Sequence, residues 1–419
     1  MVPRFQDSKG SQKEMPEKVV IIGAGQAGGQ VAQSLRAAKF EGTISLIGDE
    51  PHAPYQRPPL SKKYLMGEMD VDRLELKPKS FYADADIDLR LKTKADSIDR
   101  AAKTVALSTG EVVPYDKLVL ATGSRVRELP IPGADLPEVF YLRTVDDVDG
   151  IRGALKPGSK VSIIGGGYIG LEVAAVALKL GASVTVVEMA DRVMNRVVAP
   201  EISAFFEKLH KDAGVDLRVN AGVTKILGEG GHVSGVETNE GGTIAADIVI
   251  IGVGILPEDQ LAKDAGLDVN DGITVNEFAE TSDPDILSAG DCTNLPSELV
   301  GRRIRLESVQ NAIDQGKAVA NTLMGNKKAY NEVPWFWSDQ YDIKLQIAGL
   351  SFGYDQTVVR GNPDEKSFAV FYLKEGAIIA VDAVNAVPEF MIGKRLVGAT
   401  AKVAPEKLAD MSVSMKEMM

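Results

Sequence analysis

The sequence is poor in the residues that build disulfides and metal sites. Its 419 residues include a single cysteine, Cys292, so an intrachain disulfide is excluded, whether structural or redox-active. A lone cysteine is usually a small, buried, apolar side chain. The three histidines, His52, His210 and His232, do not form a metal-ligand motif. We therefore expect no metal.

The chain also has fewer basic than acidic residues, and it has no long apolar run. Lys and Arg number 47 against 59 Asp and Glu, a formal net charge of −12, which argues against nonspecific nucleic-acid binding. No apolar run approaches the roughly 20 residues that cross a bilayer, so we expect no membrane partner. Residues 1–17 are polar and lack the apolar segment of a secretory signal. We expect a disordered leader there and a cytoplasmic protein.

What the chain does have is a pair of glycine fingerprints, GAGQAG at 23–28 and GGGYIG at 165–170. Each follows an apolar β-branched run, at 18–22 and 160–164, and leads into an alanine-rich stretch of helical periodicity. In such a strand–turn–helix unit the first glycine makes the turn, the second lets backbone approach a pyrophosphate, and the third lets the helix pack on the strand. The phosphates face the positive end of the helix dipole. The sequence therefore predicts two dinucleotide sites.

Each fingerprint is followed by a second strand that ends in a carboxylate, Asp49 or Glu188. A carboxylate there accepts hydrogen bonds from ribose hydroxyls. The alternative is that both residues merely end their strands as solvated charges. Glu188 would repel a 2′-phosphate, which favours NADH over NADPH. Arg192 is the nearby basic residue that could swing in to bind such a phosphate.

The order of these segments predicts an α/β fold with two Rossmann-like domains and a third, α+β domain. The first domain occupies 18–124 and resumes at 257–331, the second occupies 125–256, and alternating β segments after Pro334 mark the third at 332–419. The stretch 50–63, with Pro58 and Pro59, is expected to be a stiff loop. Periodicity predicts a helix at 309–324 and strands at 87–91, 95–99, 104–106, 343–348, 356–360, 368–372 and 378–384.

These pieces together resemble the glutathione-reductase-like flavoproteins that bind two dinucleotides. Within them the chain is most similar to the NADH-dependent ferredoxin reductases of the putidaredoxin reductase-like family, which serve cytochrome P-450 monooxygenases and Rieske-type dioxygenases. The resemblance extends from residue 19 to about 397. It is carried by the segments 48–49, 57–62, 121–123, 165–172, 290–292, 307–309 and 335–340.

The tail, 398–419, matches no motif of the family that we identify. Its methionines, at 411, 415, 418 and 419, suggest a helical apolar edge, which we expect to pack on the third domain rather than bind a partner.

The resemblance implies that FAD fills the first site and NADH the second. It implies FAD contacts from Gly23, Gly25, Ala27, Gly28, Asp49, Arg57, Lys62, Ala121, Thr122, Gly123, Arg143, Asp291, Val309 and Trp337. It implies NAD contacts from Gly165, Gly167, Tyr168, Ile169, Gly170, Glu172, Glu188 and Gly254. Asp291 would bind the ribityl chain, and Lys62 and Glu172 would pair as the catalytic residues beside the two rings. Without the resemblance, Lys62 would be interpreted as a solvated loop lysine and Glu172 as a surface carboxylate.

The resemblance further implies the reaction and its partner. NADH gives two electrons as a hydride, an iron–sulfur ferredoxin takes one, and a flavin can accept a hydride and release electrons singly. We predict an enzyme, an NADH:ferredoxin oxidoreductase that reduces a [2Fe-2S] ferredoxin, which feeds a cytochrome P-450 monooxygenase or a Rieske-type dioxygenase. We expect a monomer or a weak homodimer.

Ferredoxins are usually acidic and so is this chain. Electrostatic attraction of a ferredoxin to this protein therefore requires a local basic patch. Trp335 and Trp337, two apart on a strand, should share a face, and Trp337 could anchor the partner. Each candidate could equally be an ordinary surface or core side chain. The candidate partner-binding residues are Arg302, Arg303, Arg305, Lys317, Trp337 and Lys394.

Two other functions remain possible on the same scaffold. An NADH oxidase or rubredoxin-type reductase would share both cofactors, although no cysteine lies near Lys62 to serve as a peroxidatic residue. A redox-sensing flavoprotein that acts as an interaction module is the other alternative. The charge of −12 counts against the basic DNA-binding face that such proteins often carry.

Overall fold

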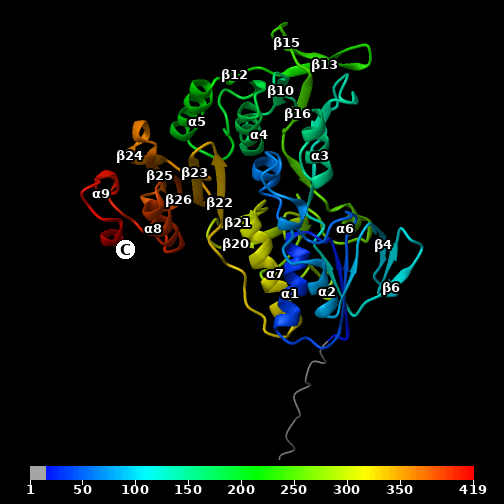
Figure 1. Cartoon of the computed structure of the whole chain (residues 1–419). Coiled ribbons are helices and arrows are strands. Elements are labelled where there is room, and N and C mark those ends of the chain that lie inside the picture. The colour runs from blue at the N-terminus through cyan, green and yellow to red at the C-terminus, as the bar shows by residue number, and fades with distance from the viewer. Residues whose placement is uncertain (1–15) are drawn as a thin grey trace, which may run out of the picture.

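The computed structural model describes residues 16–419, which form two α/β units and a third unit built on an antiparallel sheet (Figure 1). The leader expected at 1–17 lies outside the described residues, except for Pro16 and Glu17. Among residues 16–419, no helix has both the length and the apolarity that a membrane span requires.

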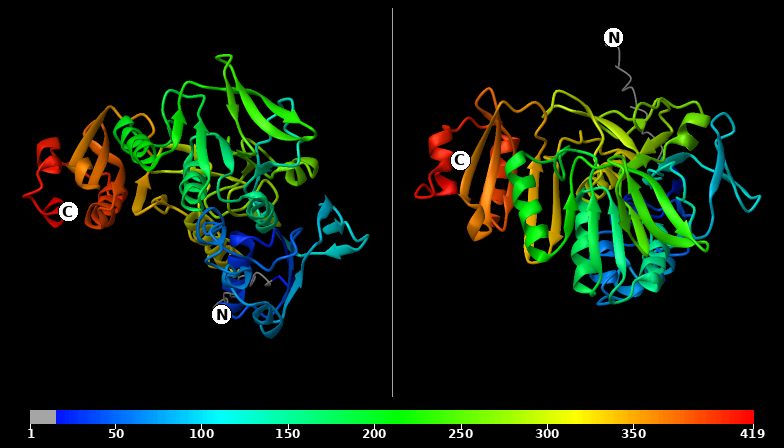
Figure 2. Two further views of the ribbon diagram at one scale, coloured as in Figure 1. Left: turned by 45° about the horizontal axis from the view of Figure 1, so that its top comes forward. Right: turned by 90° about the horizontal axis from the view of Figure 1, so that it is seen from above.

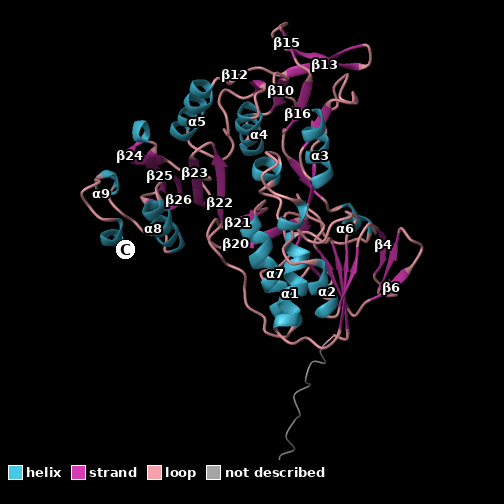
Figure 3. Ribbon diagram, in the orientation of Figure 1, coloured by secondary structure: helices cyan, strands magenta, loops and turns pink. Residues whose placement is uncertain are grey.

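The first unit is a five-stranded parallel sheet in the order β19-β7-β1-β2-β3. Its central strand β1 is apolar, β-branched and buried from its second residue, as expected where helices cover a parallel sheet. Helices α1 and α7 lie side by side next to it (Figure 3). Its main elements are β1 (Lys18–Ile22), α1 (Gln26–Ala37), β2 (Thr43–Ile47), α2 (Lys79–Asp84), β3 (Ile87–Arg90), β7 (Lys117–Leu120), β19 (Ile286–Ser288) and α7 (Val309–Leu323).

The second unit repeats this construction with the parallel order β12-β11-β10-β16-β9. Its central strands, β10 and β16, are buried along almost their whole length. Its elements are β9 (Val139–Tyr141), α3 (Val145–Ala154), β10 (Lys160–Ile164), α4 (Tyr168–Lys179), β11 (Ser183–Val187), α5 (Pro200–Ala213), β12 (Asp216–Arg218) and β16 (Ile248–Ile251).

The chain passes between these units twice, and the two passages pair with each other. Strand β8 (Ser124–Val126) runs antiparallel to β17 (Ile255–Pro257), so a two-stranded ribbon joins the first unit to the second. Smaller β segments extend from both units, and the β4–β6 sheet projects away from the body (Figure 2). The remaining elements here are β4 (Ala95–Asp99), β5 (Thr104–Leu107), β6 (Val112–Pro114), β13 (Val223–Glu229), β14 (His232–Thr238), β15 (Thr243–Ala245), α6 (Gln260–Asp264), β18 (Ile273–Thr274), β20 (Thr293–Ser297) and β21 (Arg302–Ile304).

The third unit is a five-stranded antiparallel sheet in the order β22-β23-β26-β25-β24. Each strand predicted after residue 340 lies within an observed strand, and the predicted helix at 309–324 is α7, one residue shorter. Strand β22 also packs against α4 of the second unit. The elements are β22 (Trp335–Gln340), β23 (Ile343–Gly349), β24 (Gln356–Asn362), β25 (Ser367–Lys374), β26 (Ala377–Val384), α8 (Val387–Gly398) and α9 (Pro405–Ala409).

The C-terminal tail packs on this third sheet through two of its four methionines. Met415 and Met418 are buried with the residues of β25, β26 and α8, whereas Met411 and Met419 are exposed. Arg360 of β24, itself only 3% exposed, donates to the carbonyl oxygens of Leu408, Asp410 and Val413. The tail is therefore held by a buried guanidinium as well as by apolar contacts.

Replacement of Arg360 by Met is expected to cost about 3 kcal/mol of unfolding free energy. The change leaves three carbonyl groups without their donor, and it leaves the partly buried carboxylate of Glu389, 3.2 Å from Arg360 Nε, without its cation. Lys407→Met is the control, because exposed Lys407 donates to one tail carbonyl, that of Glu417, and should change stability by under about 0.5 kcal/mol. Urea unfolding measures both, and equal losses would contradict the role given to Arg360.

Candidate functional site

At the first glycine turn the protein itself requires the outer glycines and leaves space beside the middle one. Gly23 has φ of +107°, and a Cβ there would lie 2.1 Å from the carbonyl oxygen of Ala121. A Cβ on Gly28 would lie 1.9 Å from the carbonyl oxygen of Gly23. A Cβ on Gly25 would meet no atom within 4 Å. No internal packing explains Gly25, so the open space suits a ligand that approaches the backbone.

The second turn has the same geometry. Gly165 has φ of +108°, and a Cβ there would lie 2.5 Å from the carbonyl oxygen of Gly252. A Cβ on Gly170 would lie 2.2 Å from the carbonyl oxygen of Gly165, whereas a Cβ on Gly167 would meet nothing within 4 Å. The two sites are therefore built alike.

The helices that follow these turns begin without side-chain caps. Helix α1 starts after Gly25 and α4 after Gly167, and neither has a side-chain cap or an acidic residue in its first turn. By contrast, α3 carries a capping box between Thr144 and Asp147. Uncapped N–H groups and the positive end of the helix dipole fit a diphosphate at both places.

The two acidic partners sit differently. Asp49 is exposed, and within residues 16–419 its side chain takes part in no hydrogen bond or ion pair. The carboxylate of Glu188 accepts from the backbone N–H of Gly166 (2.7 Å) and of Ala190 (2.8 Å). Glu188 is thereby fixed beside the second glycine turn. Two hydrogen bonds leave a carboxylate with further acceptor capacity for a hydroxyl.

Arg192, which we expected to be able to swing toward a 2′-phosphate, is held elsewhere. Its guanidinium donates to the carbonyl oxygens of Val198 (2.8 Å) and Asn195 (2.9 Å) and to Ser203 Oγ (2.6 Å). These three hydrogen bonds would have to break before Arg192 could bind a phosphate.

Lys62 and Glu172 form an ion pair between the first and second units. The chain turns helical at Leu60–Tyr64, where we expected loop, because the prolines at 58 and 59 precede the turn and remove no internal hydrogen bond from it. Lys62 interrupts this turn with φ of −129° and ψ of −111°, and its Nζ lies 2.6 Å from Glu172 Oε2. Glu172 is 2% exposed, so it is not a surface carboxylate.

Two serines that we had not singled out complete the surroundings of Glu172. Ser61 Oγ lies 2.5 Å from Oε2, and Ser338 Oγ lies 2.6 Å from Oε1. Three parts of the chain meet at this carboxylate: the 57–62 segment, α4 and β22. Both serines lie inside motif segments noted in the sequence, and that is the signal by which they could have been found.

A second polar group lies near the first glycine turn. The Arg57 guanidinium binds Glu50 (2.5 Å) and the carbonyl oxygen of Arg143 (2.6 Å). Arg143 Nη2 lies 3.3 Å from Asp291 Oδ2. Burial, and then the charge of Arg57, lowers the pKa of Arg143. The Nε of Arg143 is buried without a partner among the described residues, which suits a missing acceptor such as a cofactor oxygen.

The other residues expected to contact cofactors lie at the following places in the fold. Tyr168 begins α4, its ring is 4.8 Å from that of Phe336, and its hydroxyl is buried without a partner among the described residues. Ile169, next in α4, is 42% exposed. Ala121, Thr122 and Gly123 follow β7, Ala27 lies in α1, Val309 begins α7, and Gly254 with φ of +113° precedes β17.

The single thiol is buried away from solvent. Cys292 is fully buried next to Ser288 Oγ at 3.5 Å, and burial raises the pKa of its thiol. Within residues 16–419, no group of three or more His, Cys, Asp and Glu side chains is arranged to hold a metal ion.

Some candidate partner-binding residues are already bound to other groups of the protein, and others remain available to a partner. Arg303 donates to the carbonyl oxygen of Val275 and to Asn294, and Arg305 is paired with both Asp271 and Glu307. Both are therefore poorly suited to bind a partner. Lys317 is exposed, 3.4 Å from Asp314.

Each of the available cations lies over an aromatic ring. Arg302 stacks 3.6 Å above the exposed ring of Phe352, and Lys394 Nζ lies 5.5 Å from the ring centre of Trp335. The rings of Trp335 and Trp337 are 5.7 Å apart, which confirms that they share a face of β22.

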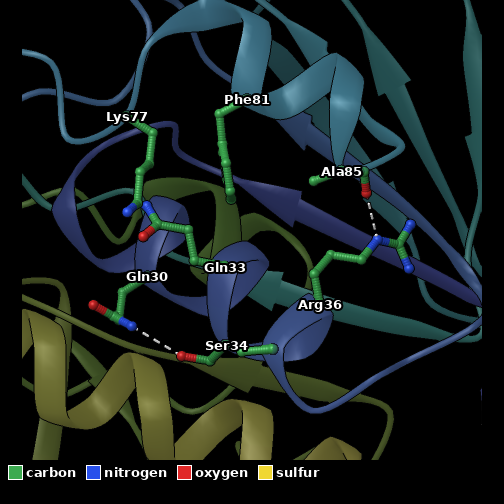
Figure 4. A pocket seen from close by; sticks show the side chains of 8 residues that line it. Gln30, Gln33, Ser34, Arg36, Lys77, Phe81 and Ala85 are labelled. Atoms are coloured by element: carbon green, nitrogen blue, oxygen red, sulfur yellow. Dashed lines mark hydrogen bonds between the residues drawn. The ribbon is translucent and has the colours of Figure 1, made fainter.

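A hollow of about 470 Å³ between α1 and α2 is a different feature from these sites (Figure 4). Its lining residues, among them Gln30, Ser34 and Phe81, come from the length of α1 beyond the glycine turn and from α2 with its flanking residues. Arg36 there is engaged with four backbone carbonyls. Arg36 is therefore not available to bind a phosphate in this hollow.

Comparison with known proteins places the chain among reductases. Residues 17–316 match the family described as pyridine nucleotide-disulphide oxidoreductase, and residues 335–419 match the family described as reductase C-terminal. Rhodocoxin reductase of Rhodococcus erythropolis is 44% identical over 398 residues, covering 95% of this chain and 93% of the relative. Putidaredoxin reductase of Pseudomonas putida is 43% identical over 407 residues, 96% of each chain.

Solved structures agree with these relatives. The ferredoxin reductase for the CYP199A2 system from Rhodopseudomonas palustris superposes with a TM-score of 0.93 at 45% identity, covering 96% of this chain and 99% of that one. The reductase in the covalent putidaredoxin reductase–putidaredoxin complex gives 0.94 at 43%, covering 96% and 98%. Because the second family match runs to residue 419, our view that 398–419 departs from the family is wrong.

Proposed function

This chain belongs to the pyridine nucleotide-disulphide oxidoreductase family, and on that premise we propose that it is an FAD-containing NADH:ferredoxin oxidoreductase. The observation that carries the proposal is the pair of glycine turns, each open only beside its middle glycine. Two diphosphate-bearing cofactors fit these turns, and electron transfer between them gives a reason for both to be present.

The assignment of cofactors to sites follows the neighbouring side chains. FAD would bind at Gly25, with Arg57, Arg143 and Asp291 around it, and NADH at Gly167 beside Glu188. When bound, the flavin supplies the exchange between a two-electron donor and a one-electron acceptor. The protein's part is to hold the diphosphates on two helix starts and to exclude water.

Lys62 and Glu172 would be the catalytic pair. Their ion pair links the helical turn at Leu60–Tyr64 to α4, the helix of the second glycine turn, and would therefore lie between the two proposed cofactor sites. A fixed pair of opposite charges there orients polar substituents of the reacting rings and sets the local electrostatics. No side chain need act as a nucleophile.

The acceptor would be a [2Fe-2S] ferredoxin that binds the aromatic–basic cluster. We give this name to the half-buried Trp337 together with the available cations Arg302 and Lys394, each of which lies over an aromatic ring. Acidic ferredoxins would be attracted by the cations, while the ring of Trp337 provides apolar contact. A monooxygenase or dioxygenase would then consume the electrons, in the cytoplasm. We propose the domain boundaries 18–124 with 257–331, 125–256 and 332–419.

Acceptor selectivity tests this function. Flavin-loaded protein, reduced by NADH without oxygen, is mixed with an oxidised [2Fe-2S] ferredoxin, a rubredoxin or oxygen in a stopped-flow spectrometer. The [2Fe-2S] protein should be reduced fastest. Rapid oxygen consumption with no transfer to any ferredoxin would instead support the oxidase alternative.

Glu188→Ser is expected to move coenzyme preference toward NADPH by about tenfold or more. The change removes the negative charge that opposes a 2′-phosphate, and the repulsion between like charges a few Å apart is worth about this much even when well screened. The measurement is the ratio of kcat/KM for NADPH to that for NADH at fixed ionic strength. Asp49→Ser, at the other acidic partner, should leave the ratio unchanged. A shift in that control would contradict the assignment of cofactors to sites.

A further inference from the structure

Behind Glu172 a row of polar side chains runs to the protein surface. Ser338 Oγ is 2.6 Å from Glu172 Oε1, and Gln340 Nε2 is 3.2 Å from Ser338 Oγ. His210 Nε2 is 2.8 Å from Gln340 Oε1, and Tyr341 OH is 3.1 Å from His210 Nδ1. Ser338, Gln340 and His210 are at most 1% exposed, whereas Tyr341 is 40% exposed. None of the four belongs to the site proposed from the sequence.

The donor and acceptor chemistry of these groups fixes the orientation of every hydrogen bond in the row. A carboxylate can only accept, so the Ser338 hydroxyl donates to Glu172 and must itself accept from the Gln340 amide N–H. The amide oxygen of Gln340 then faces His210, whose Nε2 has to carry the proton. Burial lowers the pKa of His210, so its Nδ1 is a free acceptor at neutral pH and takes the Tyr341 hydroxyl. Every donor points toward Glu172.

The row also crosses the boundary between the second and third units. Ser338, Gln340 and Tyr341 belong to β22 or follow it, while His210 lies in α5 and Glu172 in α4. Apolar side chains from the same units already form one continuous core, which includes Ile202 and Phe206 of α5 as well as Phe368 and Tyr372 of β25. The polar row is therefore not needed to join the units. Its hydrogen bonds are aligned and buried, and such hydrogen bonds strengthen one another.

We infer that Ser338, held in place by Gln340 and His210, is a positioning residue that fixes the Glu172 carboxylate against Lys62 for the reduction of bound flavin by NADH. This inference rests on the proposed function. The third unit would then complete the proposed NADH-side site, in addition to carrying the aromatic–basic cluster.

Half-reaction kinetics test the inference with a matched control. Ser338→Ala should lower the limiting rate of flavin reduction at saturating NADH about tenfold, the usual effect of one lost hydrogen bond to a charged group. Ser338→Thr, which keeps the hydroxyl, should restore the rate to within about twofold. Ferredoxin reduction by dithionite-reduced protein should be unchanged in both. The control is Thr357→Val, because Thr357 Oγ1 donates to Glu201 across the same boundary at 2.8 Å, and it should alter neither half-reaction. Equal slowing of both half-reactions by Ser338→Ala, or no slowing, would overturn the inference.

The histidine tautomer gives a readout that does not depend on activity. The chain has three histidines, so the NMR spectrum of protein labelled with ¹⁵N-histidine contains few signals. The signals that disappear in His210→Gln are those of His210. We expect a neutral imidazole protonated at Nε2. An Nδ1-protonated or doubly protonated ring would overturn the inference even if Ser338→Ala failed to fold. Failure of wild-type protein to reduce any ferredoxin would count against the proposed function and leave this result intact.

Discussion

Gly25→Asp is expected to give a folded protein that has lost its yellow colour. A Cβ on Gly25 meets no protein atom within 4 Å, and the residue has an extended backbone that aspartate readily adopts. An aspartate at the N-cap can accept from the first-turn N–H groups of α1, which should hold or slightly raise stability. The same carboxylate would occupy the place proposed for the diphosphate.

The loss of FAD affinity should be large. Two like charges about 4 Å apart at an effective dielectric of about 20 repel by about 4 kcal/mol, which is about a thousandfold in affinity. Flavin content per chain, read from the visible spectrum after loading with excess FAD, measures the effect, and thermal unfolding checks the fold. A variant that unfolds at the wild-type temperature and stays yellow would contradict the first site.

Gly167→Asp is expected to leave the protein yellow and to abolish its reduction by NADH. The second turn has the same open space beside its middle glycine and α4 has the same lack of a cap, so the carboxylate again fits the fold and opposes a diphosphate. The affinity for NADH should fall by a similar factor, about a thousandfold. Anaerobic titration with NADH, followed at the flavin absorbance, measures it.

Dithionite supplies the control for this second variant, because it reduces flavin without binding at a dinucleotide site. Reduction by dithionite should be normal in Gly167→Asp. The two aspartate variants also control each other, since each leaves the other turn intact. If Gly167→Asp lost the flavin and Gly25→Asp kept it, the two sites would be assigned the wrong way round.

The parts of the molecule that were predictable from sequence are those specified by short stretches of chain. The runs at 18–22 and 160–164 predict buried parallel strands, and the glycine spacing predicts the turns, because all the atoms involved lie within a few residues. The same holds for the alternating strands of the third unit. Helix α7 begins at Val309, as predicted, and there a local signal, the N-cap of Ser308, sets the boundary.

The parts that were not predictable depend on contacts between distant segments. Ser338 reaches Glu172 across 166 positions, and only the packing of β22 on α4 brings them together. Arg192, Arg303 and Arg305 were counted as available cations, although each is occupied by carbonyl groups or carboxylates that a sequence pattern does not reveal. The burial of Glu172 has the same origin, because its helical position alone gives no sign that a third unit covers it.

The central claim is that one chain holds two dinucleotides and passes electrons from one to the other. Its most direct test is an oxygen-free titration of flavin-loaded protein with NADH in the presence of excess oxidised [2Fe-2S] ferredoxin. The account predicts one flavin per chain and two ferredoxins reduced for each NADH consumed. A flavin that stays oxidised in excess NADH, or a chain that retains no flavin, would contradict it.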